Sequence, residues 1–250
     1  MEWRSTLRPY RTAEHRTPRV SSVMICAMRF LEPRSLIVSC QAHDDNPLRG
    51  PEFMRAMALS ALQGGADAIR ADGPADIRAI RAICDQPLIG LFKDWREGWE
   101  VYITPTLDHA REIVSAGADI VALDCTAAQR PSETLEGMIE GIHALGALVF
   151  ADCATLEDGL NAARLGADYI STTMAGYTSA TAHRKADGPD LELLEQLVKE
   201  TGKPVIGEGR FWTPEDVRRG FALGAHGIVV GTAITNPREV TKRFKRLAAS

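Results

Sequence analysis

The chain has 250 residues, of which 45% are hydrophobic and 25% are charged, and its formal net charge is -4. This composition is typical of a globular protein that buries a substantial core. The negative balance argues against general binding of nucleic acid, because contact with a phosphate backbone needs a concentrated basic surface. No apolar run approaches the roughly 20 consecutive residues that span a bilayer. We therefore expect small-molecule chemistry, without a nucleic acid or membrane partner.

The beginning of the chain differs from the rest. Arginines alternate there with Ser, Thr and Pro, and neither a helical nor an alternating apolar period is present. Such a segment cannot bury enough apolar surface to fold by itself. We expect a disordered extension over residues 1–34, followed by one catalytic domain over residues 35–250.

A Gly-Ala phrase recurs four times at intervals of about 50 residues. In each copy the glycine follows an amphipathic stretch and a β-branched run comes next, which predicts the joint between a helix and a strand. The copies are Gly64-Gly-Ala-Asp-Ala-Ile, Ala116-Gly-Ala-Asp-Ile-Val, Leu165-Gly-Ala-Asp-Tyr-Ile and Leu223-Gly-Ala-His-Gly-Ile.

Counting one further apolar run between successive joints gives eight expected strands. They are Leu36–Val38, Ala68–Ile69, Leu88–Leu91, Ile120–Leu123, Leu148–Phe150, Tyr169–Ser171, Pro204–Ile206 and Gly227–Val230. Helices are expected between them, for instance Leu107–Ser115, Leu156–Leu165, Leu191–Glu200 and Pro214–Leu223, the last with Thr213 as its N-cap. This alternation predicts an α/β fold, a single (β/α)₈ TIM barrel. A doubly wound open sheet is the alternative, but it gives no reason for eight regular units.

Polar residues follow the expected strands, where the active site of such a barrel lies. They are Gln41, Arg70, Asp72, Lys93, Asp94, Asp124, Asp152, Thr172, Thr173, Glu208 and Arg210. Any one of them could simply cap a turn. Together they converge on one mouth, and they favour a polar, oxygen-rich substrate that compensates their charge.

The turn after the last expected strand has the form of a phosphate site. Gly231 and Thr232 follow Gly227–Val230, and Gly209 follows the seventh strand. Free backbone N–H groups after strands seven and eight commonly bind phosphate in barrels. The alternative is that these glycines only permit tight turns.

Lys93 projects from the end of an expected interior strand. Apolar surroundings and a nearby Arg70 would disfavour its ammonium form, so that it could serve as a neutral amine base or as a nucleophile. Glu208 would act in the opposite direction, and an ordinary surface lysine remains the alternative.

No metal site is expected. His43 and His183 lie in presumed mouth loops without the spacing of metal ligands. The 5 cysteines are scattered and form no Cys-x-x-Cys pair, which favours reduced thiols and a cytoplasmic location. Cys40, Cys125 and Cys153 near strand ends are interpreted as inert fillers.

Eight short segments carry a resemblance to a known family. They are Val38-Ser-Cys-Gln-Ala, Ala68-Ile-Arg-Ala, Ile89-Gly-Leu-Phe-Lys, Tyr102-Ile-Thr-Pro-Thr, Ala151-Asp-Cys-Ala-Thr, Thr172-Thr-Met-Ala-Gly-Tyr-Thr, Gly207-Glu-Gly-Arg and Val230-Gly-Thr-Ala-Ile. From about Leu36 onward the sequence resembles the N-acylglucosamine-6-phosphate 2-epimerases, also called N-acetylmannosamine-6-phosphate 2-epimerases, of bacterial sialic acid catabolism.

The resemblance implies an isomerase that interconverts N-acetylmannosamine 6-phosphate and N-acetylglucosamine 6-phosphate by proton transfer at C2, without a cofactor. It implies Lys93 as the catalytic lysine and Glu208 as an acidic helper. Gln41, Arg70 and Asp152 match positions that contact the substrate, and Arg210 is expected to contact it as well.

One position departs from the family pattern. The phosphate-side run of this family usually reads Ala-Ile-Thr-Arg-Pro, whereas this chain has Asn236 in place of the arginine. An asparagine can donate a hydrogen bond to a phosphate but cannot form an ion pair with it. Asn236 is therefore expected to join Gly209, Gly231 and Thr232 at the phosphate.

Two alternatives to the epimerase remain at this point. One is a Schiff-base aldolase or lyase on a phosphosugar, with Lys93 as the nucleophile. The other is a non-catalytic phosphosugar-binding barrel. The expected partner is in every case a phosphorylated sugar, and the chain is expected to act alone or as a homodimer.

Overall fold

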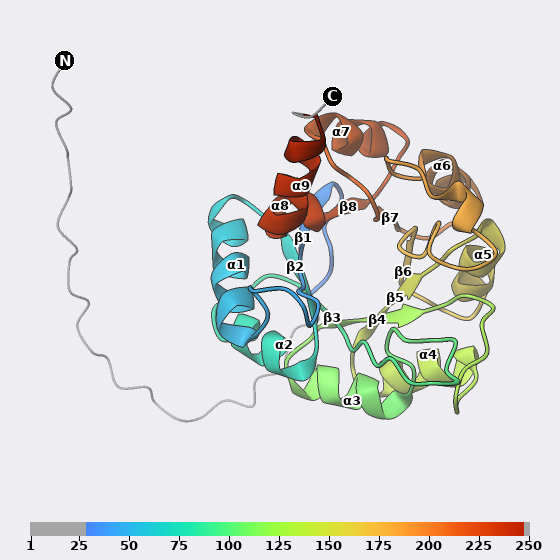
Figure 1. The fold of residues 1–250 in the computed structure, drawn as a ribbon. Coiled ribbons are helices and arrows are strands. Elements are labelled where there is room, and N and C mark those ends of the chain that lie inside the picture. The colour runs from blue at the N-terminus through green and yellow to red at the C-terminus, as the bar shows by residue number, and fades with distance from the viewer. Residues whose placement is uncertain (1–28, 248–250) are drawn as a thin grey trace, which may run out of the picture.

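The computed structural model describes residues 29–247, which form a closed ring of parallel strands surrounded by helices (Figure 1). The strands are β1 (Ser35–Cys40), β2 (Ala68–Asp72), β3 (Leu88–Leu91), β4 (Ile120–Asp124), β5 (Leu148–Asp152), β6 (Tyr169–Ser171), β7 (Val205–Gly207) and β8 (Gly227–Val230). They pair in sequence order, and β8 returns to β1 with Ser35 opposite Gly227. The predicted (β/α)₈ barrel is confirmed, as are all eight predicted strands.

Helices cover the outside of the barrel. They are α1 (Pro51–Gln63), α2 (Pro74–Arg81), α3 (Leu107–Ser115), α4 (Leu135–Ala144), α5 (Leu156–Arg164), α6 (Leu191–Glu200), α7 (Pro214–Ala222), α8 (Thr232–Thr235) and α9 (Pro237–Leu247), with a 3-10 turn at Ala182–Arg184. Thr213 caps α7 by accepting a hydrogen bond from the backbone N–H of Asp216, as predicted. No helix within residues 29–247 combines the length and the apolar character needed to cross a membrane.

The repeated Gly-Ala phrase has the predicted geometry at each helix-to-strand joint. Gly65, Gly117, Gly166 and Gly224 all have φ near +100°, between 94° and 109°. Only glycine adopts this region without a steric cost, so the phrase ends one helix and turns the chain into the next strand.

The strands alternate between two apolar layers. Residues such as Ile37, Ile89 and Phe150 fill the inside of the barrel. Their neighbours, such as Val38 and Val149, pack outward against the helices. This alternation follows from the two-residue period of a β-strand, and it decides which polar side chains face the interior at the strand ends.

The segment just before β1 closes the bottom of the barrel. Leu31 is 4% exposed and joins the interior cluster, and its backbone N–H donates to the hydroxyl of Tyr169 at 3.0 Å. Arg29 forms an ion pair with Asp119 at 2.9 Å. Residues 29–34 are thus packed on the barrel, which differs from the predicted extension over residues 1–34. A single buried apolar side chain, that of Leu31, gives no periodic signal in the sequence. The prediction for residues 1–28 lies outside the described residues.

Candidate active site

The period of the strands brings five polar side chains to the inside of the barrel mouth. Each stands two or four residues after an interior apolar residue of the same strand, so all of them point inward. They are Gln41, Arg70, Lys93, Asp152 and Glu208, following Ile37, Ala68, Leu91, Phe150 and Ile206. The convergence that the sequence analysis predicts therefore has a geometric cause.

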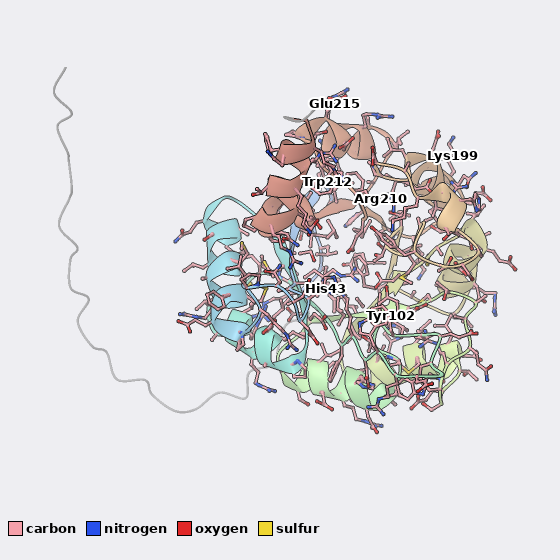
Figure 2. All side chains as sticks on the ribbon, in the orientation of Figure 1. His43, Tyr102, Lys199, Arg210, Trp212 and Glu215 are labelled. Atoms are coloured by element: carbon pink, nitrogen blue, oxygen red, sulfur yellow. The ribbon has the colours of Figure 1, made fainter. Side chains whose placement is uncertain are left out.

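A cavity of about 450 Å³ opens at this mouth. Nine of the ten predicted site residues line it: Gln41, Arg70, Lys93, Glu208, Gly209, Arg210, Gly231, Thr232 and Asn236. Figure 2 shows His43, Tyr102, Arg210 and Trp212 around the central opening, whereas Lys199 and Glu215 lie on the outer helices. The size suits a small polar ligand.

Arg70 forms the floor of the cavity. It is 1% exposed, and its guanidinium lies over the ring of Phe150, 4.9 Å from the centroid. Two nitrogens donate to the carboxylate of Asp152, at 3.0 and 2.6 Å, and Nη1 also donates to Oε2 of Glu208 at 2.5 Å. One cation is therefore shared by two buried carboxylates, and this holds the guanidinium in a fixed orientation.

Asp152 lies beneath the cavity and does not line it. Its side chain is fully buried and both oxygens accept from Arg70. Its immediate contact is thus with the arginine, one layer below the space for a ligand.

Glu208 has the ionisation of a group able to exchange protons near neutral pH. Burial raises its pKa to about 7, against the opposing effect of the Arg70 cation, while the charge of Asp152 adds to the rise. Its side chain is 13% exposed, so it reaches the cavity. A carboxyl group with this pKa suits general acid–base catalysis.

Lys93 is held at the opposite side of the mouth. Its Nζ donates to Oε1 of Gln41 at 2.7 Å, and the amide of Gln41 in turn donates to Ser39 at 2.9 Å. Burial lowers the pKa of Lys93 below its usual range, opposed by the charge of Asp72 and reinforced by that of Arg70. The site therefore favours a larger share of neutral amine than a surface lysine has.

The turn after β8 presents backbone donors to the cavity. The N–H groups of Ile234 and Thr235 bond to the carbonyl of Gly231. The N–H groups of Thr232 and Ala233, in the first turn of α8, have no backbone acceptor among the described residues. This is usual for the first turn of a helix. Such donors after strand eight can hold an anion.

Asn236 lines the same end of the cavity and directly precedes α9. Its Oδ1 accepts a hydrogen bond from the backbone N–H of Glu239 at 3.3 Å. The amide oxygen is thereby used as a helix cap, which orients the NH₂ end of the side chain as a donor.

Arg210 is bound mainly to the loop between β6 and α6. Its Nε donates to the carbonyl of Gly188 and its Nη1 to that of Ala175, both at 2.8 Å. The residue itself has φ of 58°, a strained conformation for a non-glycine residue. Arg210 thus fastens this loop beside the cavity.

Aromatic residues that were not predicted as site residues line the rim. Trp95 stacks on Tyr102 with 3.6 Å between ring centroids, and both line the cavity with Tyr177 and Trp212. The antiparallel bridge between Lys93 and Ile103 folds their loop back over the mouth. Burial raises the pKa of Tyr102 to about 12, so its hydroxyl remains protonated. Aromatic residues in loops follow no periodic pattern in the sequence. Only their closeness to the strand ends could have indicated that they line the cavity.

Asp94 and Asp124, which also follow predicted strands, do not line the cavity. Asp94 pairs with His109 at 3.0 Å, and Asp124 accepts two hydrogen bonds from Thr126.

His43 lines the cavity. Within residues 29–247, no group of three or more His, Cys, Asp or Glu residues forms a potential metal site.

The cysteines near the strand ends are buried thiols. Cys40, Cys125 and Cys153 are free and buried, and burial raises the pKa of each. Raised pKa values keep these groups in the unreactive thiol form, which agrees with their interpretation as inert fillers.

Members of one family match this chain over most of its length. A family model described as "Putative N-acetylmannosamine-6-phosphate epimerase" matches residues 54–249. A Clostridium perfringens (strain 13 / Type A) protein named "Putative N-acetylmannosamine-6-phosphate 2-epimerase" is 46% identical over 211 residues, covering 84% of this chain and 95% of that protein. A Cutibacterium acnes protein of the same name is 47% identical over 217 residues, covering 84% and 92%.

Solved structures agree with the sequence comparisons. The structure of the N-acetylmannosamine-6-phosphate 2-epimerase from Clostridium perfringens matches with a TM-score of 0.86 and 42% identity, over 92% of this chain and 100% of that one. Thiamine phosphate pyrophosphorylase from Pyrococcus furiosus matches with a TM-score of 0.56 and 21% identity, over 86% and 94%, and shares only the fold. The resemblance stated from the motifs is confirmed: this chain belongs to the N-acetylmannosamine-6-phosphate 2-epimerase family.

Proposed function

We propose that the chain is an isomerase that interconverts N-acetylmannosamine 6-phosphate and N-acetylglucosamine 6-phosphate, in amino sugar catabolism, with its own side chains as the only catalysts. The observation that carries this proposal is the amine of Lys93, held 2.7 Å from Gln41 in the cavity that Glu208 and the Gly231 turn also line. A base, an acid and an anion site thus share one mouth.

Inversion at C2 requires a C–H bond that the neighbouring C1 carbonyl makes acidic, and this carbonyl exists only after the sugar ring has opened. Lys93 as a neutral amine takes the C2 proton, and the electron pair of the C–H bond passes to the C1 oxygen as an enolate. Rotation about the C2–C3 bond turns the opposite face of the planar enolate toward the lysine, and the Lys93 ammonium returns a proton to C2 there; this gives the epimer and restores the neutral amine. Atoms and charge balance without a redox partner.

The enolate oxygen needs donors that are already in place. Gln41 and Arg70 line the cavity beside Lys93, and the orientation of Arg70 is fixed by the carboxylate of Asp152. Fixed donors stabilise developing charge more effectively than water, which must reorganise. Asp152 acts in this proposal through Arg70, and Arg210 acts through the loop that it fastens.

Glu208 exchanges the proton that ring opening moves between the ring oxygen and the C1 hydroxyl. Its pKa of about 7 lets it both donate and accept at neutral pH. The phosphate lies at Gly209, Gly231, Thr232 and the amide of Asn236, so that its binding energy positions C2 at the lysine.

The test is to incubate the purified protein with each sugar and to follow its conversion by proton NMR. We expect N-acetylmannosamine 6-phosphate to be converted and the unphosphorylated sugar to be turned over far more slowly. Absence of conversion of the 6-phosphate, with the fold intact, would contradict the proposal. It would leave the non-catalytic phosphosugar-binding barrel.

The Schiff-base alternative has its own test. An imine between Lys93 and a carbonyl substrate is trapped irreversibly by borohydride, whereas an amine that only moves a proton is not. Loss of activity with borohydride plus substrate, together with a mass increase at Lys93, would favour the aldolase or lyase.

A cytoplasmic location and a homodimer complete the proposal. Cys40, Cys84, Cys125 and Cys153 are free thiols, as is usual for proteins of reducing compartments. Ile234 on α8 and Phe244 on α9 are 46% and 70% exposed, and each is an apolar side chain that a second copy could cover. Light scattering of the purified protein measures the assembly.

A further inference from the structure

Asp72, the last residue of β2, contacts Lys93 through both of its carboxylate oxygens. Oδ1 accepts a hydrogen bond from the backbone N–H of Lys93 at 3.0 Å. Oδ2 lies 3.9 Å from the Nζ atom at the end of the same residue. The carboxylate of Asp72 thus contacts both the backbone N–H and the side-chain amine of Lys93.

The register of the sheet explains this double contact. Asp72 lies opposite Leu91 in the β2–β3 pair, and Lys93 comes two residues later on the same side of β3. The last backbone pair between β2 and β3 is Asp72 with Leu91. Beyond it, the side chain of Asp72 takes the place of a backbone acceptor for the N–H of Lys93. Any chain that ends β2 with an acceptor here can hold the backbone, but only a carboxylate adds a charge.

Charges from three strands act on the amine of Lys93. Asp72 and Arg70 belong to β2, Asp152 to β5, and Glu208 follows β7; Lys93 itself follows β3. Asp152 and Glu208 already share the cation of Arg70. Asp72 forms no ion pair with Arg70. Its negative charge is therefore not offset by that cation and acts on Lys93.

We propose that Asp72 is a positioning residue for Lys93, which fixes the direction of its backbone and supplies the counter-charge for its ammonium form. The proposal rests on the proposed function of Lys93 as the base. When the amine takes the C2 proton it becomes a cation in a partly buried site, and the carboxylate stabilises that cation. When the proton leaves again, the amine is restored and remains hydrogen-bonded to Gln41.

The surroundings of Asp72 provide a matched control. Asp76 stands four residues later, on α2, and its pKa is raised to about 6 by burial and by the charge of Asp72, against the effect of Arg49. Asp76 is a second carboxyl group beside Asp72, but the charges that act on Lys93 do not include it. Removing either carboxylate changes the net charge equally, and only one of them faces the lysine.

The experiment is an NMR titration of ¹³Cε-labelled lysines in the full-length chain, with the Lys93 signal assigned by its absence in Lys93→Met. In Asp72→Asn we expect the pKa of Lys93 to fall by about one unit or more, which is a tenfold or larger loss of proton affinity. In Asp76→Asn we expect it to stay within a few tenths of a unit of the wild-type value. Asp72→Ser, which keeps an acceptor without a charge, repeats the measurement if the asparagine variant does not fold.

Kinetics provide the second readout. The acidic limb of the pH profile of kcat/KM is expected to move to lower pH in Asp72→Asn by the same amount as the NMR pKa, with a lower plateau because the base is weaker. A merely structural residue would lower the plateau and leave the limb in place. An unchanged Lys93 pKa in both Asp72 variants would overturn the proposal.

The two readouts separate this proposal from the function of the site. The titration measures the lysine without turnover, so a shifted pKa in Asp72→Asn supports the contact even if the enzyme acts on another substrate. Full activity of Lys93→Met would instead contradict the proposed base, whatever the titration shows.

Discussion

Nζ of Lys93 donates a hydrogen bond to Oε1 of Gln41 at 2.7 Å, which links the end of β3 to the end of β1 on either side of β2. The contact holds the amine toward the cavity in both of its protonation states, because ammonium and amine alike carry an N–H donor. It also leaves the lone pair of the neutral amine free for a proton at C2.

Replacement of Gln41 should lower turnover more than stability. In Gln41→Ala we expect kcat to fall by about ten- to a hundredfold, since the amine loses its orientation and the enolate loses a donor. Steady-state kinetics and urea unfolding measure the two effects. Gln63→Ala, at the exposed end of α1, serves as the control and should change neither quantity. Equal kinetics for the two variants would contradict a role for Gln41.

Removal of the Arg70 cation should destabilise the barrel. Arg70→Met leaves the buried carboxylates of Asp152 and Glu208 without their shared partner. Breaking one side of a buried ion pair typically costs about 3–5 kcal/mol of unfolding free energy. The same change at Arg164, whose side chain is bonded to Asn161 on the surface of α5, should cost less than about 0.5 kcal/mol. Urea unfolding at constant pH compares the two, and similar stabilities would argue against a structural role for the network.

Glu208 should make stability depend on pH. Its pKa is about 7 in the folded chain against an ordinary value of 4.5, so the folded state binds the extra proton between these two values. The resulting stabilisation is complete below pH 4.5 and is lost as the pH rises through 7, by about 3 kcal/mol. Glu208→Gln cannot titrate, and its stability should not follow this decline. Urea unfolding from about pH 5 to about pH 8 measures both proteins, and parallel curves would contradict the raised pKa.

Asn236 should limit the affinity for phosphate. In Asn236→Arg an ion pair becomes available, and we expect the KM for the 6-phosphate substrate to fall by about tenfold while the unphosphorylated sugar is unaffected. The variant also loses the cap of α9, which should cost about 1 kcal/mol of stability. An unchanged KM, or an equal gain for both sugars, would place the phosphate elsewhere.

The barrel and the direction of its interior side chains could be predicted because both follow from local rules. A glycine with positive φ ends each repeat, and alternation along a strand fixes whether Arg70 or Lys93 points inward. The pairings among these side chains depend on register and tilt between strands, which no single segment encodes. For that reason the pairing of Asp152 with Arg70, beneath the residues that line the cavity, could not be read from the sequence.

Loop residues were the least predictable part of the site. Trp95 stacks on Tyr102 because the loop between them folds back and is closed by the Lys93–Ile103 bridge. No periodic pattern in the sequence predicts that contact. The partners of Arg210 are backbone carbonyls of a distant loop, and these carry no sequence signal at all.

The most direct test of Lys93 as the proton-transferring base is incubation with N-acetylmannosamine 6-phosphate in deuterated water. Wild-type protein should place deuterium at C2 of both the product and the recovered substrate. Lys93→Met should keep the fold by circular dichroism and incorporate no label. Conversion without deuterium at C2, or labelling by Lys93→Met at a rate near that of the wild type, would contradict the account.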